Sequence, residues 1–395
     1  MKGPDPKGPL EGPRHPTASE YPAFLKFLSF SYGYTPFNWF ENYNSHFYCP
    51  KPEQLKLKWV LKSDRRFVSH VGIFPFTAWV EGRPLKVAGI GGVATHPDFR
   101  NQGLKHLLME HVQNELRKDG YDLSILWGHS LYRTYGYEWA IPRERFTFAK
   151  RFLKAPGARE GIRPGRKSDW KGILELYRRH PYHTERGPEY YQTIQRTFQG
   201  DLAQPLWVLE KSGKPAAYVI VFKAGPKELE MAEWGGMAED VSRLLVGVFL
   251  NRPEKDLQIS LGEGSDLLPW ARVNADDQVR GAEYTMVKVL RLGRVMKVFE
   301  PQLQKRYSKL GLKPRWSYTL QLGTGETVTV RLGKKLQVEE GKKGDVLLSL
   351  HPLECVRLLL GLGRPSEWLG LKGPEIVFLD FLFPLRWFWW RSEWI

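Results

Sequence analysis

The chain has only two cysteines, Cys49 and Cys355, among its 395 residues. So few cysteines exclude a disulfide framework and a metal site built from cysteine ligands, and we expect no metal cofactor. Residues 1–16 are polar and rich in Pro and Gly, and they lack the apolar core of a signal peptide. We therefore expect residues 1–16 to be a loose tail and the protein to be cytoplasmic.

A long uninterrupted apolar run is also missing. The most apolar stretch is Ile376–Ile395, and Asp380, Pro384 and Arg386 interrupt it. Its apolar runs fall far short of the roughly 20 residues that a membrane span needs, so we expect no transmembrane segment. Trp and Arg side by side favour either a membrane-surface role or a tail buried against the body of the protein. Burial would stabilise such a tail by about 25 cal/mol per Å² of apolar area.

Positive charge is in excess, with 59 Lys and Arg against 43 Asp and Glu and a formal net charge of +16. Such an excess can indicate nucleic-acid binding. The charges are scattered, however, and no recognition helix or RNA-stacking motif accompanies them, so we expect no nucleic-acid partner. The composition is globular, and the length suggests two to three domains.

The richest signal lies in Val87–Ala140. An apolar run, Val87–Thr95, predicts a buried strand, and a second strand is predicted at Tyr121–Trp127. Between them, Phe99–Gly103 is a turn that carries Arg100. The helix that follows is predicted from the spacing of apolar residues at Leu104, Leu107, Leu108, Val112 and Leu116.

The turn before this helix can bind an anion. A helix N-terminus presents free backbone N–H groups and the positive end of the macrodipole. Gly103 has no Cβ and lets a bulky diphosphate approach the main chain, and Arg100 adds positive charge. An Arg-x-x-Gly sequence alone is also compatible with an ordinary solvated helix start.

The order of these motifs is more specific. Val93–Pro97, the Arg-x-x-Gly turn, the helix, the strand and then Leu131–Tyr137 together resemble the acetyl-CoA site of GNAT-type N-acetyltransferases. The phrases AGIGGVATHPDFRNQGL and LYRTYGYEWA resemble the first domain of the "enhanced intracellular survival" (Eis-like) branch. One departure is Lys105, which stands where many family members carry a second Gly or Ala.

The resemblance implies an α+β fold with mixed α/β sheets, in which two tandem GNAT-type domains precede a sterol-carrier-protein-like domain. The domains would span residues 1–150, 151–283 and 284–395. Antiparallel strands are expected at Phe67–Phe74 and Thr77–Val80 in the first, and a strand around Val287–Leu290 would open the third. The second domain has no Arg-x-x-Gly turn after a buried strand, so we expect no CoA site there. The resemblance also implies a homo-oligomer, such as a hexamer.

By the same resemblance, the protein is an acetyl-CoA-dependent N-acetyltransferase that acts on a primary amine, either aminoglycoside- or polyamine-like or lysine-like. Tyr132 is expected to be the general acid, unless it only packs under the following turn. The base is expected to be the α-carboxylate of Ile395, with the chain end reaching the active site. Four histidines are alternatives for the base: His46, His70, His96 and His129.

The resemblance places acetyl-CoA, as co-substrate, mostly against backbone atoms. The expected contacts are Val93, Ala94, Thr95, Arg100, Asn101, Gln102, Gly103, Leu104, Lys105, His106, Trp127 and Gly128. The aromatic segment Phe24–Tyr48 would either wall the acceptor pocket or cover the sheet. An alternative function is a lipid or membrane-surface binding protein that uses the third domain and the aromatic tail.

Overall fold

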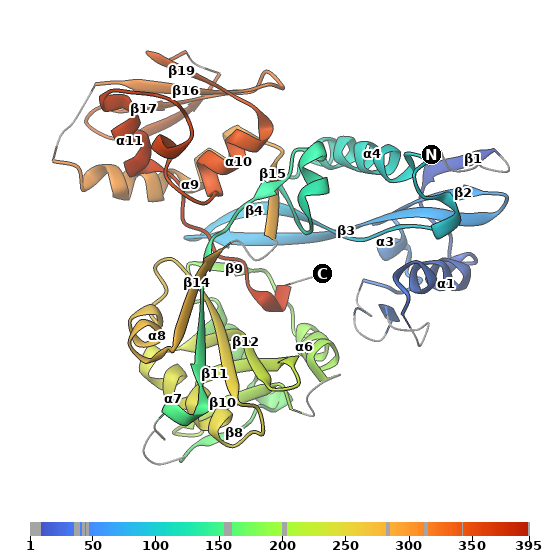
Figure 1. Ribbon diagram of the computed structural model, residues 1–395, viewed down its shortest axis with the longest axis vertical. Helices are drawn as coiled ribbons and strands as arrows, with labels where there is room; N and C mark the ends of the chain where they lie inside the picture. Colours follow the sequence, from blue (N-terminus) through green and yellow to red (C-terminus); the bar gives the residue numbers. More distant parts are fainter. Residues whose placement is uncertain are drawn as a thin grey trace.

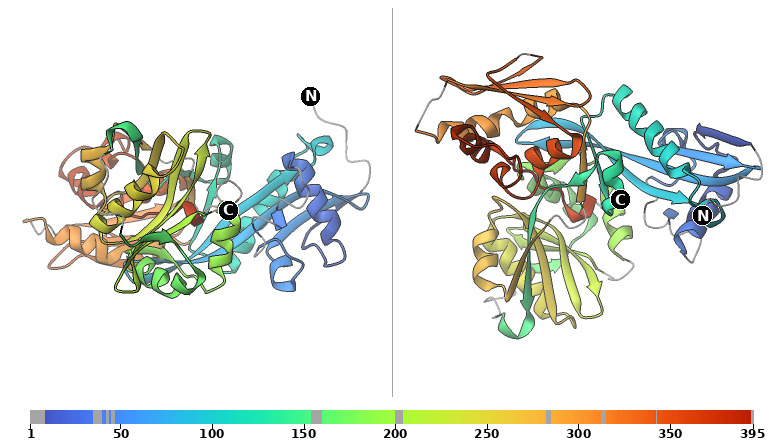
Figure 2. Two further views of the ribbon diagram at one scale, coloured as in Figure 1. Left: turned by 90° about the horizontal axis from the view of Figure 1, so that it is seen from below. Right: turned by 45° about the horizontal axis from the view of Figure 1, so that its top comes forward.

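The computed structural model describes residues 9–34, 40–41, 44, 47–153, 160–199, 204–281, 285–311, 315–341 and 343–393. These residues form three sheets, of eight, seven and four strands. Each sheet and the helices packed on it form one of three units, which lie side by side around a common centre (Figures 1 and 2). The predicted class, α+β with mixed sheets, is confirmed.

The first unit contains the eight-stranded sheet. Only its β4–β5 pair is parallel, and helix α4 (Leu104–Lys118) packs on it through its buried residues Leu104, Leu108, Val112 and Leu116. Helices α1 (Tyr21–Tyr32) and α3 (Pro52–Leu55) flank the sheet near its N-terminal strands. The strand order is β1 (Leu10–Arg14), β2 (Lys58–Ser63), β3 (Arg66–Val80), β4 (Arg83–Thr95), β5 (Leu123–Trp127), β15 (Thr285–Val289) and β6 (Glu138–Trp139), and β9 (Tyr182–Thr184) pairs with the end of β3.

Two expectations about the first unit are corrected. Within the expected loose tail, Leu10–Arg14 is an edge strand paired with β2, because the open edge of β2 offers backbone partners to any extended segment. The strands expected at Phe67–Phe74 and Thr77–Val80 are one strand, β3. Pro75 does not interrupt it, because β2 pairs with β3 only as far as Gly72 and β9 begins at Ala78. The missing N–H of Pro75 therefore lies where β3 has no second neighbour.

The second unit contains the seven-stranded sheet, which is mostly antiparallel with one parallel pair, β12–β13. Its core lies between the sheet and its helices and includes Phe146, Ile173, Leu245 and Trp390. The strand order is β14 (Asp277–Gly281), β7 (Arg143–Ala149), β13 (Asp256–Gly262), β12 (Glu228–Gly236), β11 (Lys214–Gly225), β10 (Leu206–Lys211) and β8 (Ile162–Pro164), with helices α5 (Trp170–Tyr177), α6 (Tyr190–Gln199), α7 (Ala238–Leu250) and α8 (Leu268–Asn274).

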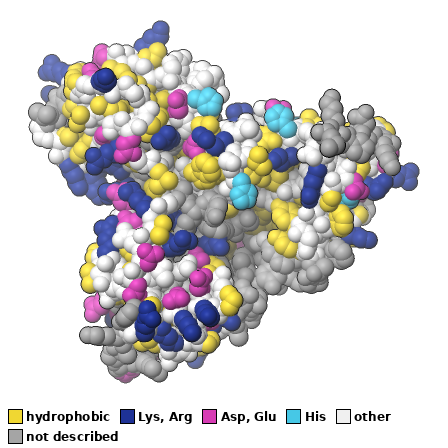
Figure 3. All heavy atoms as spheres, viewed as in Figure 1, with side chains coloured by type: hydrophobic (Ala, Val, Ile, Leu, Met, Phe, Trp, Pro, Cys, Tyr) yellow, Lys and Arg dark blue, Asp and Glu magenta, His cyan; other side chains and the backbone are white. Residues whose placement is uncertain are grey.

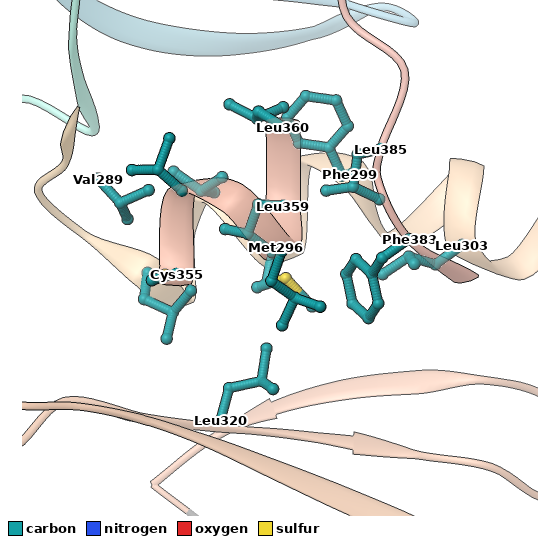
Figure 4. Close-up of a cluster of buried hydrophobic side chains, with 14 of the residues drawn as sticks. Val289, Met296, Phe299, Leu303, Leu320, Cys355, Leu359, Leu360, Phe383 and Leu385 are labelled. Carbon is teal, nitrogen blue, oxygen red and sulfur yellow. The ribbon is translucent and has the colours of Figure 1, made fainter. Parts of the chain in front are cut away.

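The third unit is a four-stranded sheet covered by three helices. Hydrophobic side chains of the helices, among them Met296, Phe299 and Leu359, face Leu320 of the sheet (Figure 4), and all belong to one buried cluster. The strand order is β18 (Gln337–Glu340), β17 (Thr327–Arg331), β16 (Ser317–Leu322) and β19 (Val346–Leu350), and the helices are α9 (Leu292–Ser308), α10 (Pro352–Leu360) and α11 (Pro374–Leu382). The same core continues to Val87 and Leu123 of the first sheet, so the first and third units share one hydrophobic interior.

Two strands lie in a different sheet from the one that the expected division gives them. Strand β7, which the expected division assigns to residues 1–150, lies in the second sheet between β13 and β14. Strand β15, which the same division assigns to the third domain, lies in the first sheet between β5 and β6. Each pairs where a neighbouring strand presents an unpaired edge, whatever its place in the sequence. The division at 150 and 283 therefore stays a prediction that must accommodate this exchange.

Candidate active site

The site is built on the divergence of β4 and β5. Their parallel pairing covers only Val87–Gly89 and Leu123–Ile125. Beyond it, Leu126 and Trp127 pair with β15 and no longer with β4. Two strands that separate in this way open a wedge between them, and the expected contact residues at the ends of both strands border it.

A bulge shapes the β4 side of the wedge. The pairing of β4 with β3 shifts between Gly91 and Ala94, and Gly92 has a φ of 61°, which favours glycine. His70 fixes the bulge, because its Nδ1 donates to the carbonyl of Gly92 at 2.6 Å. The phenol of Tyr32 donates to the carbonyl of Val93 at 3.1 Å. Side chains thus hold the carbonyls of two successive residues, Gly92 and Val93, at the wedge.

His70 is a poor candidate for the catalytic base. Its side chain is fully buried, and burial lowers its pKa to about 3. His96 accepts a hydrogen bond from the N–H of Asp98 at 3.2 Å, which makes it the cap of a short turn. His129 is exposed just before Tyr132, and His46 lies outside the described residues.

Helix α4 begins just after Gly103, shortly after the end of β4 on the same side of the wedge. Asn101 and Gly103 both have positive φ angles, 63° and 76°, which turn the chain sharply into the helix. A Cβ on Gly103 would meet no atom within 4 Å, so the space beside its Cα is open. The first N–H groups of the helix have no partners within it. This exposed turn, with Arg100 at its start, fits a diphosphate.

Tyr132 lies in the 3-10 turn η2 (Ser130–Tyr135), directly after β5. Its ring packs over Gly128, where a Cβ would lie only 2.6 Å from a ring carbon. Tyr135 and Tyr137 lie beside it, with ring centroids at 6.2 and 6.4 Å. The pKa of Tyr132 is raised to about 12, mainly by burial and to a smaller extent by the neighbouring Tyr135. The phenol therefore keeps its proton near neutral pH and can donate it.

Lys105 lies close to this phenol. Its Nζ is 5.5 Å from the ring centroid of Tyr132 and 5.9 Å from that of Tyr135. The departure from the Gly or Ala that many family members carry thus brings a cation over the two rings. This charge lies between the turn at Gly103 and the Tyr132 ring.

Lys288 and Gln113 were not among the predicted residues, yet they hold the turn. Lys288 of β15 donates to the carbonyl of Tyr135 at 2.7 Å and to the Gln113 side chain. Gln113 of α4 donates to the same carbonyl at 3.2 Å. Burial lowers the pKa of Lys288 to about 8. No local sequence signal marks Lys288, because it reaches the turn only through the pairing of β15 with β5 and β6.

The C-terminal segment is fixed by a buried cluster of charges. Glu393, the last described residue, accepts from Arg186 at 2.7 Å, from Tyr177 at 3.0 Å and from Tyr190 at 3.1 Å. Arg186 also donates to Glu233 at 2.7 Å. Arg186, Glu233, Glu393 and Tyr177 are almost fully buried, and Tyr190 is partly buried. Trp394 and Ile395 lie outside the described residues, so the predicted position of the terminal carboxylate stays a prediction.

The aromatic segment divides between core and surface. Phe24, Phe27, Phe40 and Tyr48 belong to a buried cluster against β3 and β4, whereas Phe30 is 53% exposed. Tyr32 contacts Val93, so it reaches the wedge. Of the other aromatic residues noted in the segment, Phe37, Trp39 and Tyr43 lie outside the described residues.

Comparison with known proteins identifies the domain. Residues 13–140 match the model of the acetyltransferase (GNAT) domain family. No curated protein matches the chain. The chain therefore contains a GNAT acetyltransferase domain, a class that uses acetyl-CoA as donor, and it is an acetyltransferase.

Three solved structures share the fold. A probable N-acyltransferase from Enterococcus faecalis is 20% identical, with a TM-score of 0.66, and the match covers 94% of both chains. A GCN5-related N-acetyltransferase from Anabaena variabilis is 17% identical, with a TM-score of 0.70, over 96% of this chain and all (100%) of that one. Eis1 from Mycobacterium abscessus is 13% identical, with a TM-score of 0.65, over 98% of this chain and 100% of that one.

The alternative of a membrane-surface protein is not favoured. Among the described residues, no helix is both long and apolar enough to cross a membrane. Trp387, Trp389 and Trp390 are no more than 5% exposed, so these rings face the protein interior. Leucines and aromatic rings fill the interior of the third unit (Figure 4).

Proposed function

We propose that this chain, which contains a GNAT acetyltransferase domain, transfers an acetyl group directly from acetyl-CoA to a primary amine. The acceptor would be aminoglycoside- or polyamine-like or lysine-like. The observation that carries the proposal is the wedge between β4 and β5, which has the open N-terminus of α4 on one border and the protonated Tyr132 on the other.

Acetyl-CoA would be held mainly by main-chain groups. The open space beside Gly103 and the unpartnered N–H groups of the first turn of α4 fit its diphosphate. Arg100 and Lys105 supply positive charge on either side of Gly103. Val93–Thr95 and Trp127–Gly128 would border its acetyl-bearing arm. When bound, acetyl-CoA supplies a thioester as acyl donor.

Two protein groups act on protons and charge in this proposal. Tyr132 donates its phenolic proton to the leaving thiolate, a contribution of roughly 10²–10⁴ in rate for a positioned acid. The N–H of Val93, set by the bulge that His70 fixes, stabilises the negative charge on the carbonyl oxygen.

The base is proposed to be the α-carboxylate of Ile395. An unperturbed α-carboxylate has a pKa of about 3.5, so it would accept the amine proton through burial or a relay of water and would stabilise the cation. The support for this role is the anchoring of Glu393, two residues before Ile395, in a cluster of buried charges. The Eis-like layout, the sterol-carrier-protein-like third domain and the hexamer remain parts of the same proposal.

Calorimetry with acetyl-CoA tests the proposal, and micromolar to millimolar binding is expected. Tyr132→Phe should reduce kcat by about 100-fold or more while acetyl-CoA affinity changes little. Tyr121→Phe is the matched control, because Tyr121 is a buried phenol of the same unit that precedes β5. Absence of acetyl-CoA binding would refute the proposal, and equal losses in the two variants would remove Tyr132 from its role.

A separate experiment tests the base. A few residues appended after Ile395 would displace the carboxylate, so activity should be lost while acetyl-CoA binding persists. Full activity in the extended protein would instead favour the exposed His129 as base.

A further inference from the structure

A large cavity lies outside the proposed active site, where the second and third units meet. Its volume is about 840 Å³, within the range of about 300–1,000 Å³ that is typical of small-molecule sites. Its walls come from the end of α9, the turn after β13 and the segment that follows α11. It also includes Glu81 at the tip of the β3–β4 hairpin, the end of β4 opposite the wedge.

Charged side chains gather where the second and third units meet (Figure 3), and six cations and five carboxylates line the cavity. Most of these carboxylates have a partner. Glu263 pairs with Arg386 at 2.7 Å, Asp380 accepts from the N–H of Ser366 at 2.8 Å, and Glu81 accepts from Gln302 at 3.5 Å. Within the described parts of the chain, Asp266 and Glu367 are the lining carboxylates without a hydrogen-bond or ion-pair partner.

Fewer of the lining cations have a hydrogen-bond or ion-pair partner. Among the described residues, the structure shows no hydrogen bond or ion pair for the side chains of four lining cations, twice the number of such carboxylates. These four are Arg280, Lys305, Lys309 and Arg364. Lys305 and Lys309 are one helical turn apart at the end of α9, and Arg364 follows α10 in the same unit. The third-unit side of the cavity therefore carries unneutralised positive charge.

A fifth cation lies deeper in the wall. Arg306 donates to the carbonyls of Leu382 and Pro384 at 2.7 and 2.6 Å, which fixes its guanidinium. Burial and then the neighbouring Arg386 lower the pKa of Arg306. Arg306 therefore contributes a fixed positive charge to the wall.

Rings complete the wall. Tyr182, Phe381 and Phe388 line the cavity and are only partly buried. A partly exposed ring offers a face for a flat or apolar group. The cavity thus presents guanidinium and ammonium groups beside ring faces, a combination that suits molecules with both an anionic part and a ring.

We propose that this cavity is a second binding site, which takes a metabolite-sized organic polyanion with a ring portion. The phosphate or carboxylate groups bind Lys305, Lys309 and Arg364, and the ring packs against Phe388. The site goes beyond the proposed acetyl transfer and does not depend on it. Because Phe388 and Arg386 belong to the C-terminal segment, an occupant also stabilises the position of that segment.

The test is titration calorimetry with three probes in the absence of acetyl-CoA. ATP carries polyphosphate and a ring, tripolyphosphate carries the charge alone, and citrate is a polycarboxylate. Lys305→Ala/Lys309→Ala removes two cavity cations, and Lys334→Ala/Lys335→Ala is the matched control with the same charge change. Lys334 and Lys335 are exposed in the same unit and do not line the cavity.

The expected result is saturable binding of ATP, weakened about tenfold or more by the cavity pair and less than about twofold by the control pair. ATP should bind more tightly than tripolyphosphate, and Phe388→Ala should remove that difference. Binding of citrate without binding of ATP would overturn the ring part of the proposal, because citrate carries no ring. Absence of saturable binding up to about 10 mM, or equal weakening by both lysine pairs, would overturn the proposal.

Discussion

At the scale of single residues, two residues that do no chemistry themselves determine where the Tyr132 phenol lies. Gly128 leaves room for the ring, since any Cβ there would overlap it. Lys288 fixes the carbonyl of Tyr135 and with it the turn that carries the phenol. The position of the proposed acid thus depends on one absent methyl group and one buried amine.

Gly128→Ala tests the first of these contacts. The added Cβ would lie 2.6 Å from the Tyr132 ring, so the ring must move, and kcat should fall by about tenfold or more. Gly323→Ala is the control, because a Cβ on that exposed turn glycine meets no atom within 4 Å. Steady-state kinetics on both variants decides the matter, and unchanged turnover in Gly128→Ala would show that Tyr132 needs no fixed position.

Lys288→Met tests the second contact through pH. The folded-state pKa of Lys288 is about 8 against a usual 10.5, and Lys58 has the same shift through burial. Between these two pH values the unfolded chain binds more protons on both lysines, so the free energy of unfolding rises as pH increases from 8. In Lys288→Met, the contribution of Lys288 to this rise in unfolding free energy is lost, and the contribution of Lys58 remains.

Urea unfolding at pH values between 8 and 9.5 measures this slope below the range where tyrosines ionise, about pH 10. The increase in unfolding free energy with pH should be smaller in Lys288→Met than in the original protein. An identical increase in both would mean that Lys288 is fully charged in the folded state.

At the scale of secondary-structure elements, local periodicity was sufficient for the centre of the site. The helix predicted after Gly103 is confirmed as α4, and the two strands around it are confirmed as β4 and β5. The places of β7 and β15 could not be predicted. Their pairing joins strands far apart in the sequence, and a strand's own pattern shows that it is buried without showing which edge it joins.

Gly103→Ala tests the turn that opens α4. Alanine at a φ of 76° is strained by about 1–2 kcal/mol, and its Cβ would enter the open space where we place the diphosphate. The KM for acetyl-CoA should rise by about tenfold. Gly213→Ala matches the strain, with a φ of 73° and open space, on a hairpin of the second unit. A similar rise in KM in both variants would mean that strain alone explains the effect.

At the scale of the whole molecule, the C-terminal segment joins all three units. The backbone N–H of Leu385 donates to the carbonyl of Leu359 in the third unit at 2.6 Å. Trp390 donates at 3.1 Å to the carbonyl of Tyr182, which is in a strand of the first sheet. In the second unit, Arg186 donates a hydrogen bond to Glu393. The sequence indicated a buried aromatic tail, but the buried ion pairs could not be predicted, because their partners come from residues about 200 positions away.

Glu393→Ala should release this segment without unfolding the body. Removing Glu393 leaves Arg186 paired with Glu233, so the second unit keeps a balanced pair of buried charges. The tail loses the acceptor of Arg186, Tyr177 and Tyr190, and with it the anchor on which the proposed role of the terminal carboxylate depends. Turnover should fall by about tenfold or more while acetyl-CoA affinity stays the same.

Limited proteolysis read by mass spectrometry reports the tail independently of activity. In Glu393→Ala, cleavage after the aromatic residues of the tail should become faster, since bound backbone resists proteases until it opens. Glu175→Ala is the matched control, because Glu175 is exposed on α5 of the same unit. Faster cleavage with full turnover would mean that catalysis does not need the anchored tail, and it would favour His129 as the base. Unchanged cleavage would mean that the aromatic rings alone hold the tail.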